Sequence, residues 1–415
     1  MIKVDIIRPR SINAIIGPVG TLKRMLKNQE YFNSRGYELT VFTNESINIG
    51  PIKEPPAAVK PKTTVKSRLR SRIVSFLHMH AKSNRRLAQW VLDKDREKTE
   101  VLVDYYLSLD RQPDIIQFHS NLECQLYMQK RKDTKARTVM FLHSDGIPFK
   151  MLLQYYPCLE GSKYLKQLSD DLTWTIEHTD RIVFIAKTGQ TNFLKFFPQR
   201  SLQDTSVIIN GIDDLTAVQQ QEVAVIRRAS SAYKYRLCCT GTINTRKGHR
   251  IIIEALHQMD KAVLKEVHVD FMGEGAERPV LEDLVKEYGL TEHVTFYGLV
   301  PNVEVYRHLA QNNIYILMSK NEGLPISIIE ALRAGLPVIS TDVSGIPELV
   351  RPEYNGFLLN PDAEELTALL NKLPEYDWET MGRNSRKRFE EEFTFERMER
   401  EFCDMYDVVK NSNNG

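Results

Sequence analysis

Two glutamates with the spacing of a paired binding site are the most informative residues of the sequence. Glu322 and Glu330 are separated by eight positions, in a segment that starts as a glycine loop at 321–325 and continues as a helical pattern over 326–334. Inside one helix, eight positions would hold the two carboxylates roughly 12 Å apart. With Glu322 in the loop and Glu330 two turns into the helix, they can instead flank one ligand with hydroxyls at both ends, because carboxylates accept hydrogen bonds from vicinal hydroxyls.

The local sequence predicts where this helix begins and ends. Pro325 suits the first helical turn, where the N–H that it lacks would have no partner. Gly335 followed by Pro337 is a typical stop signal. An apolar run at 314–318 precedes the loop, so the expected arrangement is strand, glycine loop and helix. The free N–H groups and positive dipole end of such a helix favour binding of a phosphate or of sugar hydroxyls.

Short apolar runs alternate with longer segments of helical pattern along the chain. The runs lack strict polar alternation, which is typical of parallel strands buried on both faces. They are 2–7, 38–42, 114–118, 138–142, 181–185 and 206–209 in the first half, and 236–240, 267–272, 294–297, 314–318, 337–340 and 356–359 in the second. We therefore predict an α/β protein with two doubly wound Rossmann-like domains facing a cleft.

The length of 415 residues is suited to two domains. A junction is expected near 211–235, where Asn210-Gly211 ends a strand and polar residues follow. The predicted domains are 1–212 and 213–392, and the last segment, 393–415, is predicted to be a helix that crosses back to the N-terminal domain. Because ligands of doubly wound sheets bind at the carboxyl ends of the strands, functional residues are expected in the loops that follow strands.

Composition limits the class of protein. Hydrophobic residues make up 42% and charged residues 27%, the balance of a soluble globular protein. The formal net charge of +2 argues against nucleic acid as a partner. The five cysteines form no CxxC pair, and neither a signal-peptide pattern nor an apolar run of about 18 residues is present. We therefore expect a reduced, cytoplasmic protein.

The segment 322–348, which begins Glu-Gly-Leu-Pro, resembles the signature of the family 4 retaining glycosyltransferases, which have the GT-B fold. The resemblance implies transfer of a sugar, with retention, from a nucleoside diphosphate sugar to a hydroxyl during surface polysaccharide or glycolipid assembly. It also implies that Glu322 orients the donor sugar and that Glu330 binds the ribose. The donor-binding residues carried over from this segment are Glu322, Gly323, Leu324, Pro325, Ile326 and Glu330.

A basic loop after the run at 236–240 resembles the first loop of the C-terminal domain in the same family. The resemblance implies that Lys247 neutralises the donor diphosphate, with Gly241 and Arg246 in the same loop and Glu274 at the nucleotide edge. A fixed positive charge there would stabilise the leaving diphosphate as the glycosidic bond breaks. Thr242 stands where many members carry an arginine, so Arg246 is the candidate for the second charge. The alternative for Arg246 is a basic surface turn.

The N-terminal half contributes a glycine loop and two histidines. Gly17 and Gly20 resemble the loop that approaches the acceptor and the donor phosphate in the family, although a plain turn would have the same glycines. His143 resembles the family histidine that contacts the transferred sugar near its reacting centre. With Glu322 and Lys247, it completes the predicted catalytic set. His119 is predicted to contact the acceptor, and packing beneath the acceptor loop is the alternative.

The charged residues of 60–86 are all Lys or Arg, and apolar residues recur among them at helix-like spacing. A basic amphipathic helix of this kind can lie on an anionic membrane surface, which would place the protein on the inner face of the membrane. The alternative is the solvated face of a helix that covers the N-terminal domain.

The expected partners are a nucleotide sugar and a sugar or lipid-linked acceptor. No cofactor is expected, and no metal is required, because the sequence has no Asp-x-Asp clamp at a strand end. Two alternatives stay open: a GT-B nucleotide-sugar epimerase or phosphorylase, and a non-catalytic partner subunit with the same fold. A non-catalytic subunit would be expected to lack Glu322 or Lys247.

Overall fold

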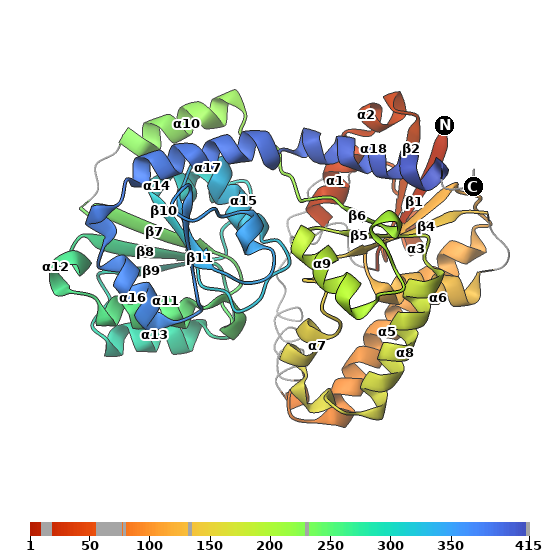
Figure 1. Cartoon of the computed structure of the whole chain (residues 1–415), viewed down its shortest axis with the longest axis horizontal. Coiled ribbons are helices and arrows are strands. Elements are labelled where there is room, and N and C mark those ends of the chain that lie inside the picture. The colour runs from red at the N-terminus through yellow and green to blue at the C-terminus, as the bar shows by residue number, and fades with distance from the viewer. Residues whose placement is uncertain (10–18, 55–76, 78–79, 132–134, 229–231, 412–415) are drawn as a thin grey trace. The chain divides into compact units, whose positions relative to one another are not determined.

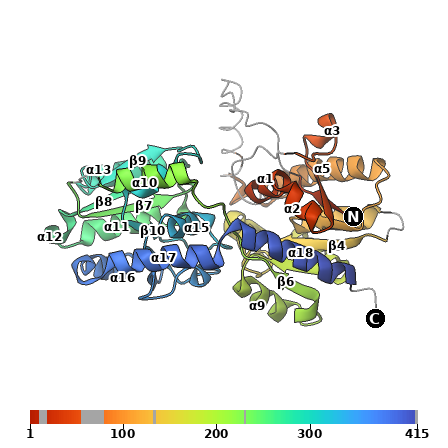
Figure 2. The ribbon, with the colours of Figure 1, turned by 90° about the horizontal axis from the view of Figure 1, so that it is seen from above.

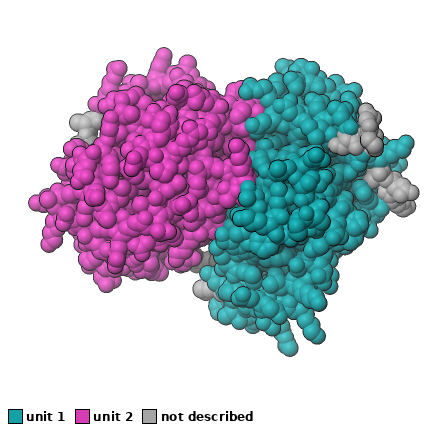
Figure 3. Space-filling model, viewed as in Figure 1, with its two compact units in different colours: residues 1–185, 189–208, 399–415 teal, residues 186–188, 209–398 magenta. Residues whose placement is uncertain are grey.

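The computed structural model describes residues 1–9, 19–54, 77, 80–131, 135–228 and 232–411. The chain divides into two compact units (Figure 3). Unit 1 comprises residues 1–185, 189–208 and 399–415, and unit 2 comprises 186–188 and 209–398. Gly17 and most of the basic stretch at 60–86 lie outside the described residues.

Unit 1 contains a parallel sheet of six strands in the order β2-β1-β3-β4-β5-β6. The chain runs from β1 outward to β2 and then returns to the other side of β1 with β3, so the strand order reverses between β1 and β3. The strands are β1 Ile2–Ile7, β2 Tyr37–Phe42, β3 Ile115–Phe118, β4 Arg137–Leu142, β5 Arg181–Phe184 and β6 Thr205–Val207.

Helices pack on both faces of this sheet (Figure 1). They are α1 Val19–Lys27, α2 Gln29–Ser34, α3 Ser46–Ile49, α5 Arg85–Ser108, α6 Asn121–Lys130, α7 Lys150–Tyr155, α8 Lys163–His178 and α9 Lys187–Phe196. On one face, α6 packs between α5 and α8 and against β3 and β4. Phe118 and Met140 belong to the buried cluster on this face. Because side chains alternate along a strand, Gln117 and Phe141 point to the opposite face.

Unit 2 repeats the same architecture, with strand order β12-β11-β10-β7-β8-β9 and every neighbouring pair parallel. Here the strand order reverses between β7 and β10. The strands are β7 Tyr235–Thr240, β8 Val267–Met272, β9 Val294–Gly298, β10 Ile314–Leu317, β11 Val338–Thr341 and β12 Gly356–Leu359. The four inner strands, β7, β8, β10 and β11, are almost entirely buried, as is expected of strands covered on both faces, whereas the edge strands β9 and β12 are mostly only partly buried.

The helices of unit 2 pack in pairs, α11 against α16, α15 against α17 and α10 against α14. Their bounds are α10 Ala217–Arg228, α11 His249–Gln258, α12 Lys261–Leu264, α13 Arg278–Glu287, α14 Val305–Gln311, α15 Ile326–Arg333, α16 Ala363–Leu370 and α17 Trp378–Glu392. The last helix, α18 (Phe395–Asn411), begins in unit 2 and joins unit 1 from Glu399 onward. In unit 1 it lies on the sheet (Figure 2). Its Phe402 stacks on Phe141, and its Tyr406 lies against Tyr37.

The predicted fold class of two doubly wound domains is confirmed, and each of the twelve apolar runs coincides with a strand to within two residues. Two local details differ from the prediction. Pro325 occupies the N-cap position of α15 with extended backbone, instead of the first helical turn, because the helix begins one residue later. Glu330 is then the fifth residue of α15, which is little more than one turn into the helix. Within the described residues, no helix has the length and apolarity to cross a membrane.

Candidate active site

The loops that follow β7 and β10 lie side by side at the point where the strand order of unit 2 reverses. Ligands of doubly wound sheets bind at such a point, outside the carboxyl ends of the strands. Hydrogen bonds join the two loops directly. The backbone N–H of Lys320 donates to the carbonyl of Arg246 at 2.8 Å, and Nη1 of Arg246 donates to the carbonyl of Asn321 at 2.6 Å. The loops therefore form one structural unit.

Lys247 and Arg246 both contact the carboxylate of Glu322. Oε1 of Glu322 lies 2.7 Å from Nζ of Lys247 and 3.0 Å from Nη1 of Arg246. The hydroxyl of Ser319 donates to the same oxygen at 2.8 Å. Burial alone would raise the pKa of Glu322, but the charges of Lys247 and Arg246 bring it below its ordinary value. Glu322 therefore stays ionised although it is almost fully buried, with 9% of its side chain exposed.

The basic loop is shaped by a cap and a glycine. The side-chain oxygen of Asn244 accepts from the backbone N–H groups of Arg246 and Lys247, at 3.1 and 3.2 Å, and so holds a short 3-10 turn over Thr245–Lys247. Gly248 then takes a left-handed conformation with φ of 72°, and a Cβ placed there would lie 1.9 Å from the carbonyl oxygen of Met318. Only glycine allows this approach of the lysine loop to the end of β10.

Lys247 also lies over Gly241, whose ideal Cβ position is 3.8 Å from Nζ. The backbone N–H of Gly241 donates to Met272 at 2.9 Å, and that of Ile243 donates to Glu274 at 2.9 Å, so the loop after β8 joins the same edge. The side chain of Glu274 forms an ion pair with Arg278. Gly241 and Glu274 therefore lie in loops that are hydrogen-bonded to each other.

The start of α15 lies beside this cluster. Leu324 and Pro325 are buried, Gly323 and Ile326 are partly exposed, and the partly buried Glu330 follows within the helix. The loop after β11 supports the turn, because Gly345 donates its N–H to the carbonyl of Gly323 at 3.1 Å.

In unit 1, His119 follows β3 and His143 follows β4, and the two imidazoles are in contact. Nδ1 of His119 lies 3.0 Å from Nε2 of His143, and the rings are nearly parallel. His119 is only 4% exposed, and its other ring nitrogen is 2.9 Å from Nε2 of Gln117. Both ring nitrogens of His119 therefore have side-chain partners, which favours a packing role for His119 over contact with the acceptor. Gly20 lies in α1 and is exposed, with nothing within 4 Å of its ideal Cβ position.

Both histidines are held neutral by their surroundings. Burial, with a smaller contribution from the charge of Arg8, lowers the pKa of His143 to about 3. Burial likewise lowers the pKa of His119 far below its ordinary value. At neutral pH, His143 therefore offers one N–H donor and one nitrogen acceptor, and no positive charge.

Sequence reasoning missed three residues of these clusters. Ser319 precedes Glu322 by three positions and bonds to it, and Gln117 shares a strand face with His119, so local spacing carried a weak signal for both. Tyr406, whose hydroxyl donates to Oε1 of Gln117 at 2.6 Å, comes from α18 and has no sequence signal at all.

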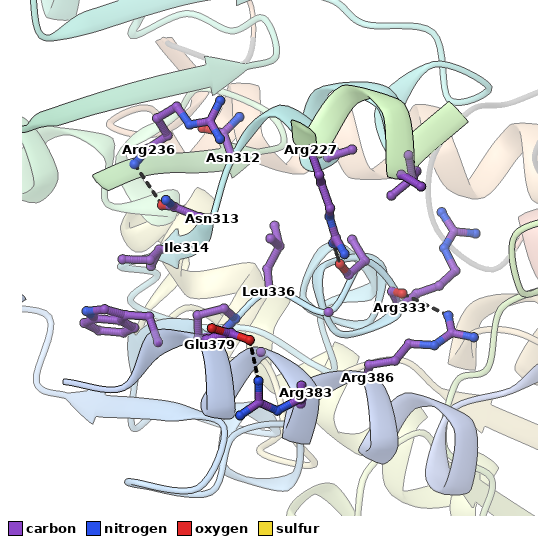
Figure 4. A pocket seen from close by; sticks show the side chains of 18 of the residues that line it. Arg227, Arg236, Asn312, Asn313, Ile314, Arg333, Leu336, Glu379, Arg383 and Arg386 are labelled. Atoms are coloured by element: carbon purple, nitrogen blue, oxygen red, sulfur yellow. Dashed lines mark hydrogen bonds and ion pairs between the residues drawn. The ribbon is translucent and has the colours of Figure 1, made fainter. Parts of the chain in front are cut away.

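A pocket of about 1230 Å³ lies at the amino ends of the unit 2 strands β7, β10 and β11 (Figure 4). Arginines line much of it, but several are already engaged. Arg383 pairs with Glu379 at 2.6 Å, and Arg386 pairs with Asp214, which lies beside the pocket. Since it lies at the opposite strand ends from Lys247 and Glu322, this pocket is not the predicted donor site.

The family comparison falls on unit 2. The model of the glycosyl transferases group 1 family matches residues 220–392, which contain β7 to β12 and all of the Lys247–Glu322 cluster. Residues 220–392 are therefore similar to a group 1 glycosyl transferase domain. The matched segment also contains Glu274 and Glu330.

Curated relatives match over part of their length. A putative colanic acid biosynthesis glycosyltransferase, WcaL of Escherichia coli K12, is 30% identical over 181 residues, which are 40% of this chain and 43% of that protein. The putative glycosyltransferase EpsD of Bacillus subtilis is 27% identical over 219 residues, 52% of this chain and 53% of that one. The chain thus spans about half the length of the curated relatives that it matches.

Solved structures match over the whole chain. A sucrose-phosphate synthase from Thermosynechococcus elongatus aligns with a TM-score of 0.71 and 19% identity, and covers 99% of both chains. HepE of Anabaena, in complex with UDP, aligns with a TM-score of 0.62 and 16% identity over 98% of this chain and 100% of that one. The fold is therefore that of the GT-B glycosyltransferases.

Proposed function

We propose that the protein is a glycosyltransferase that takes a sugar from a nucleoside diphosphate donor and transfers it to an acceptor hydroxyl, with retention at the anomeric carbon. The observation that carries the proposal is the convergence of Lys247 and Arg246 on Glu322, at the strand-order reversal of a group 1 domain. Three charged side chains of this kind, beside a glycine-rich backbone, suit a ligand that joins a diphosphate to a sugar.

The charge of the cluster fits the diphosphate. Two cations against one carboxylate leave a net positive charge at the carboxyl ends of β7 and β10. As the glycosidic bond breaks, negative charge grows on the leaving diphosphate. A cation already held in position then stabilises the transition state more than the ground state. Asn244 and Gly248 fix the backbone of the loop, so little reorganisation is needed.

The remaining roles follow from the same ligand. Glu322 accepts hydrogen bonds from hydroxyls of the donor sugar, Glu330 accepts those of the ribose, and the first turn of α15 receives a phosphate oxygen. His143, neutral at pH 7, contributes a hydrogen bond to the transferred sugar. These assignments extend the resemblance of Glu322, Glu330 and His143 to the family residues, and no metal is needed for any of them.

The similar proteins indicate which substrates to test first. HepE has been solved with UDP, with UDP and glucose, and with UDP-glucose, so a UDP-sugar is the first donor to try. WcaL is named for colanic acid biosynthesis, and AmsK of Erwinia amylovora for amylovoran biosynthesis. We therefore propose the hydroxyl of a growing surface polysaccharide as the acceptor.

The test is turnover of a panel of nucleotide sugars by the full chain and by two lysine variants. Lys247→Met keeps most of the side-chain volume and removes the charge. We expect it to bind nucleoside diphosphate more weakly and to lose about 100- to 1000-fold in kcat, the usual cost of deleting one preorganised donor. Lys286→Met is the matched control, because Lys286 also pairs with a carboxylate, Asp283 at 3.1 Å, but is exposed on α13.

Full transferase activity in Lys247→Met would overturn the phosphate role. If no nucleotide sugar raised the melting temperature of the wild-type chain or was turned over by it, the proposed function itself would be wrong.

A further inference from the structure

Four buried or partly buried side chains form a continuous hydrogen-bonded chain in unit 1. It runs from Tyr406 on α18 to Gln117 on β3, then to His119, and ends at His143 after β4. The three contacts measure 2.6, 2.9 and 3.0 Å between their polar atoms. Each ring nitrogen of a neutral histidine either donates or accepts, so the direction of every bond in the chain depends on its neighbour.

The hydroxyl of Tyr406 sets that direction. Tyr406 is fully buried, and within the described part of the chain the one acceptor recorded for its hydroxyl proton is Oε1 of Gln117. If the amide of Gln117 were turned over, this proton would face an NH₂ group. A buried donor without an acceptor costs about 1–3 kcal/mol. The orientation with Oε1 toward Tyr406 and Nε2 toward His119 is therefore the favoured one.

The proton positions on the two histidines then follow in order. Nε2 of Gln117 can only donate, so Nε2 of His119 must accept. A neutral His119 then carries its proton on Nδ1 and donates it to Nε2 of His143. His143 must in turn carry its own proton on Nδ1. Burial keeps both rings neutral, so no second proton interrupts this order.

We propose that Tyr406 and Gln117 are positioning residues that fix the tautomer of His143, so that it presents Nδ1–H as a hydrogen-bond donor. The consequence rests on the proposed function: Nδ1–H of His143 donates to an oxygen of the sugar that is transferred. The three hydrogen bonds link α18 to His143, and they set its tautomer without any change of charge.

The tautomers can be read without substrate, by proton–nitrogen correlation NMR on the full chain with isotope-labelled histidine. At about pH 7.5, above the ordinary histidine pKa of about 6.5, the spectrum separates protonated from unprotonated ring nitrogens. We expect His119 and His143 both to carry the proton on Nδ1, with the two residues assigned through single His→Asn variants. A proton on Nε2 of either ring would overturn the proposal.

Tyr406→Phe removes only the hydroxyl. Either orientation of the Gln117 amide then leaves one buried polar group without a partner, so the two become similar in free energy. We expect a second tautomer to appear at His119 and His143. We expect kcat to fall about two- to tenfold with little change in KM, as when only a fraction of molecules is competent.

Tyr37→Phe is the matched control. Tyr37 lies 5.2 Å from the Tyr406 ring, and its hydroxyl donates to Asp407 instead of Gln117. We expect this variant to leave the tautomers and kcat unchanged.

The outcomes separate the two proposals. Unchanged tautomers in Tyr406→Phe would overturn the proposal that Tyr406 and Gln117 fix the tautomer of His143. A lower rate would not rescue it, because a merely structural role would lower the rate in the same way. If the wild-type protein shows the Nδ1–H tautomers but turns over no nucleotide sugar, the tautomer proposal is supported and the proposed function is contradicted.

Discussion

Nζ of Lys247 lies 2.7 Å from Oε1 of Glu322, although the two residues belong to loops that follow different strands. Their contact has two consequences. Each side chain holds the other in place before any ligand arrives, which reduces the cost of organising the site. If Lys247 binds the donor diphosphate as proposed, the diphosphate must compete with Glu322, and this carboxylate would limit the affinity for a bare nucleoside diphosphate.

Glu322→Gln separates binding of the diphosphate from transfer of the sugar. Without the carboxylate, Lys247 and Arg246 attract an anion more strongly, so we expect a nucleoside diphosphate to bind at least as tightly as in the wild type. Transfer should fall about 10- to 100-fold, because a hydrogen bond to a charged group is worth about 1.5–3 kcal/mol. Calorimetric titration and initial rates measure the two effects. Weaker diphosphate binding in this variant would contradict the charge argument.

In Glu322→Gln we also expect a loss of stability that depends on pH. Breaking the cluster should lower the free energy of unfolding by about 2 kcal/mol, less than for a fully buried pair, since Arg246 keeps part of its side chain exposed. The pKa of Glu322 is lowered in the folded state, so this contribution is complete above the unfolded value of 4.5. It is lost as the pH falls through the lower, folded value. Denaturant unfolding of wild type and variant at several pH values gives the difference.

Gly248→Ala tests the close approach of the lysine loop to β10. Gly248 and Gly289 both have left-handed backbone, with φ of 72° and 68°. Alanine at Gly289 meets nothing within 4 Å, so it should cost only the left-handed strain of about 1–2 kcal/mol. Alanine at Gly248 must also displace the backbone of Met318. We expect a larger fall in melting temperature and a loss of nucleotide-sugar binding in Gly248→Ala alone. Equal behaviour of the two variants would contradict this account.

We expect the buried His249 to make unit 2 less stable as the pH falls. Burial, with a smaller contribution from Lys247, lowers the pKa of His249 to about 4. Between pH 6.5 and 4 the unfolded chain binds a proton at this residue that the folded chain does not, so stability falls as the pH falls. The slope is at most about 1.4 kcal/mol per pH unit for one histidine. In His249→Gln we expect a shallower dependence of unfolding free energy on pH in this window. An unchanged slope would show that His249 titrates normally.

His143→Asn and His143→Gln test which ring nitrogen matters. The side-chain amide of asparagine places its NH₂ close to the position of Nδ1, whereas that of glutamine reaches the position of Nε2. If His143 acts through Nδ1–H, Asn should retain more of the transfer rate than Gln, by about tenfold for one neutral hydrogen bond of about 1.4 kcal/mol. Steady-state kinetics at saturating donor compare the variants, and a better rescue by Gln would argue for Nε2 instead.

Much of the fold could be predicted from the sequence because parallel strands buried on both faces leave uninterrupted apolar runs. The boundaries shifted by a residue or two where backbone pairing, and not apolarity, ends a strand. Within 211–235, where the polar composition predicted the domain junction, the structure has the helix α10 at 217–228, with Val223 as its buried residue. A helix that buries one narrow face on its neighbours gives a weak apolar signal.

The sequence by itself determined which loops carry the candidate site residues, since the residues that end each strand are local features. Lys247, Glu322, His119 and His143 were all placed after strands in this way. Only the tertiary structure decided which of these residues contact each other. The reversal of strand order brings the β7 and β10 loops together, so that Lys247 meets Glu322, and α18 brings Tyr406 to Gln117. Such contacts join residues that are distant in the chain, and their geometry depends on packing that no local pattern encodes.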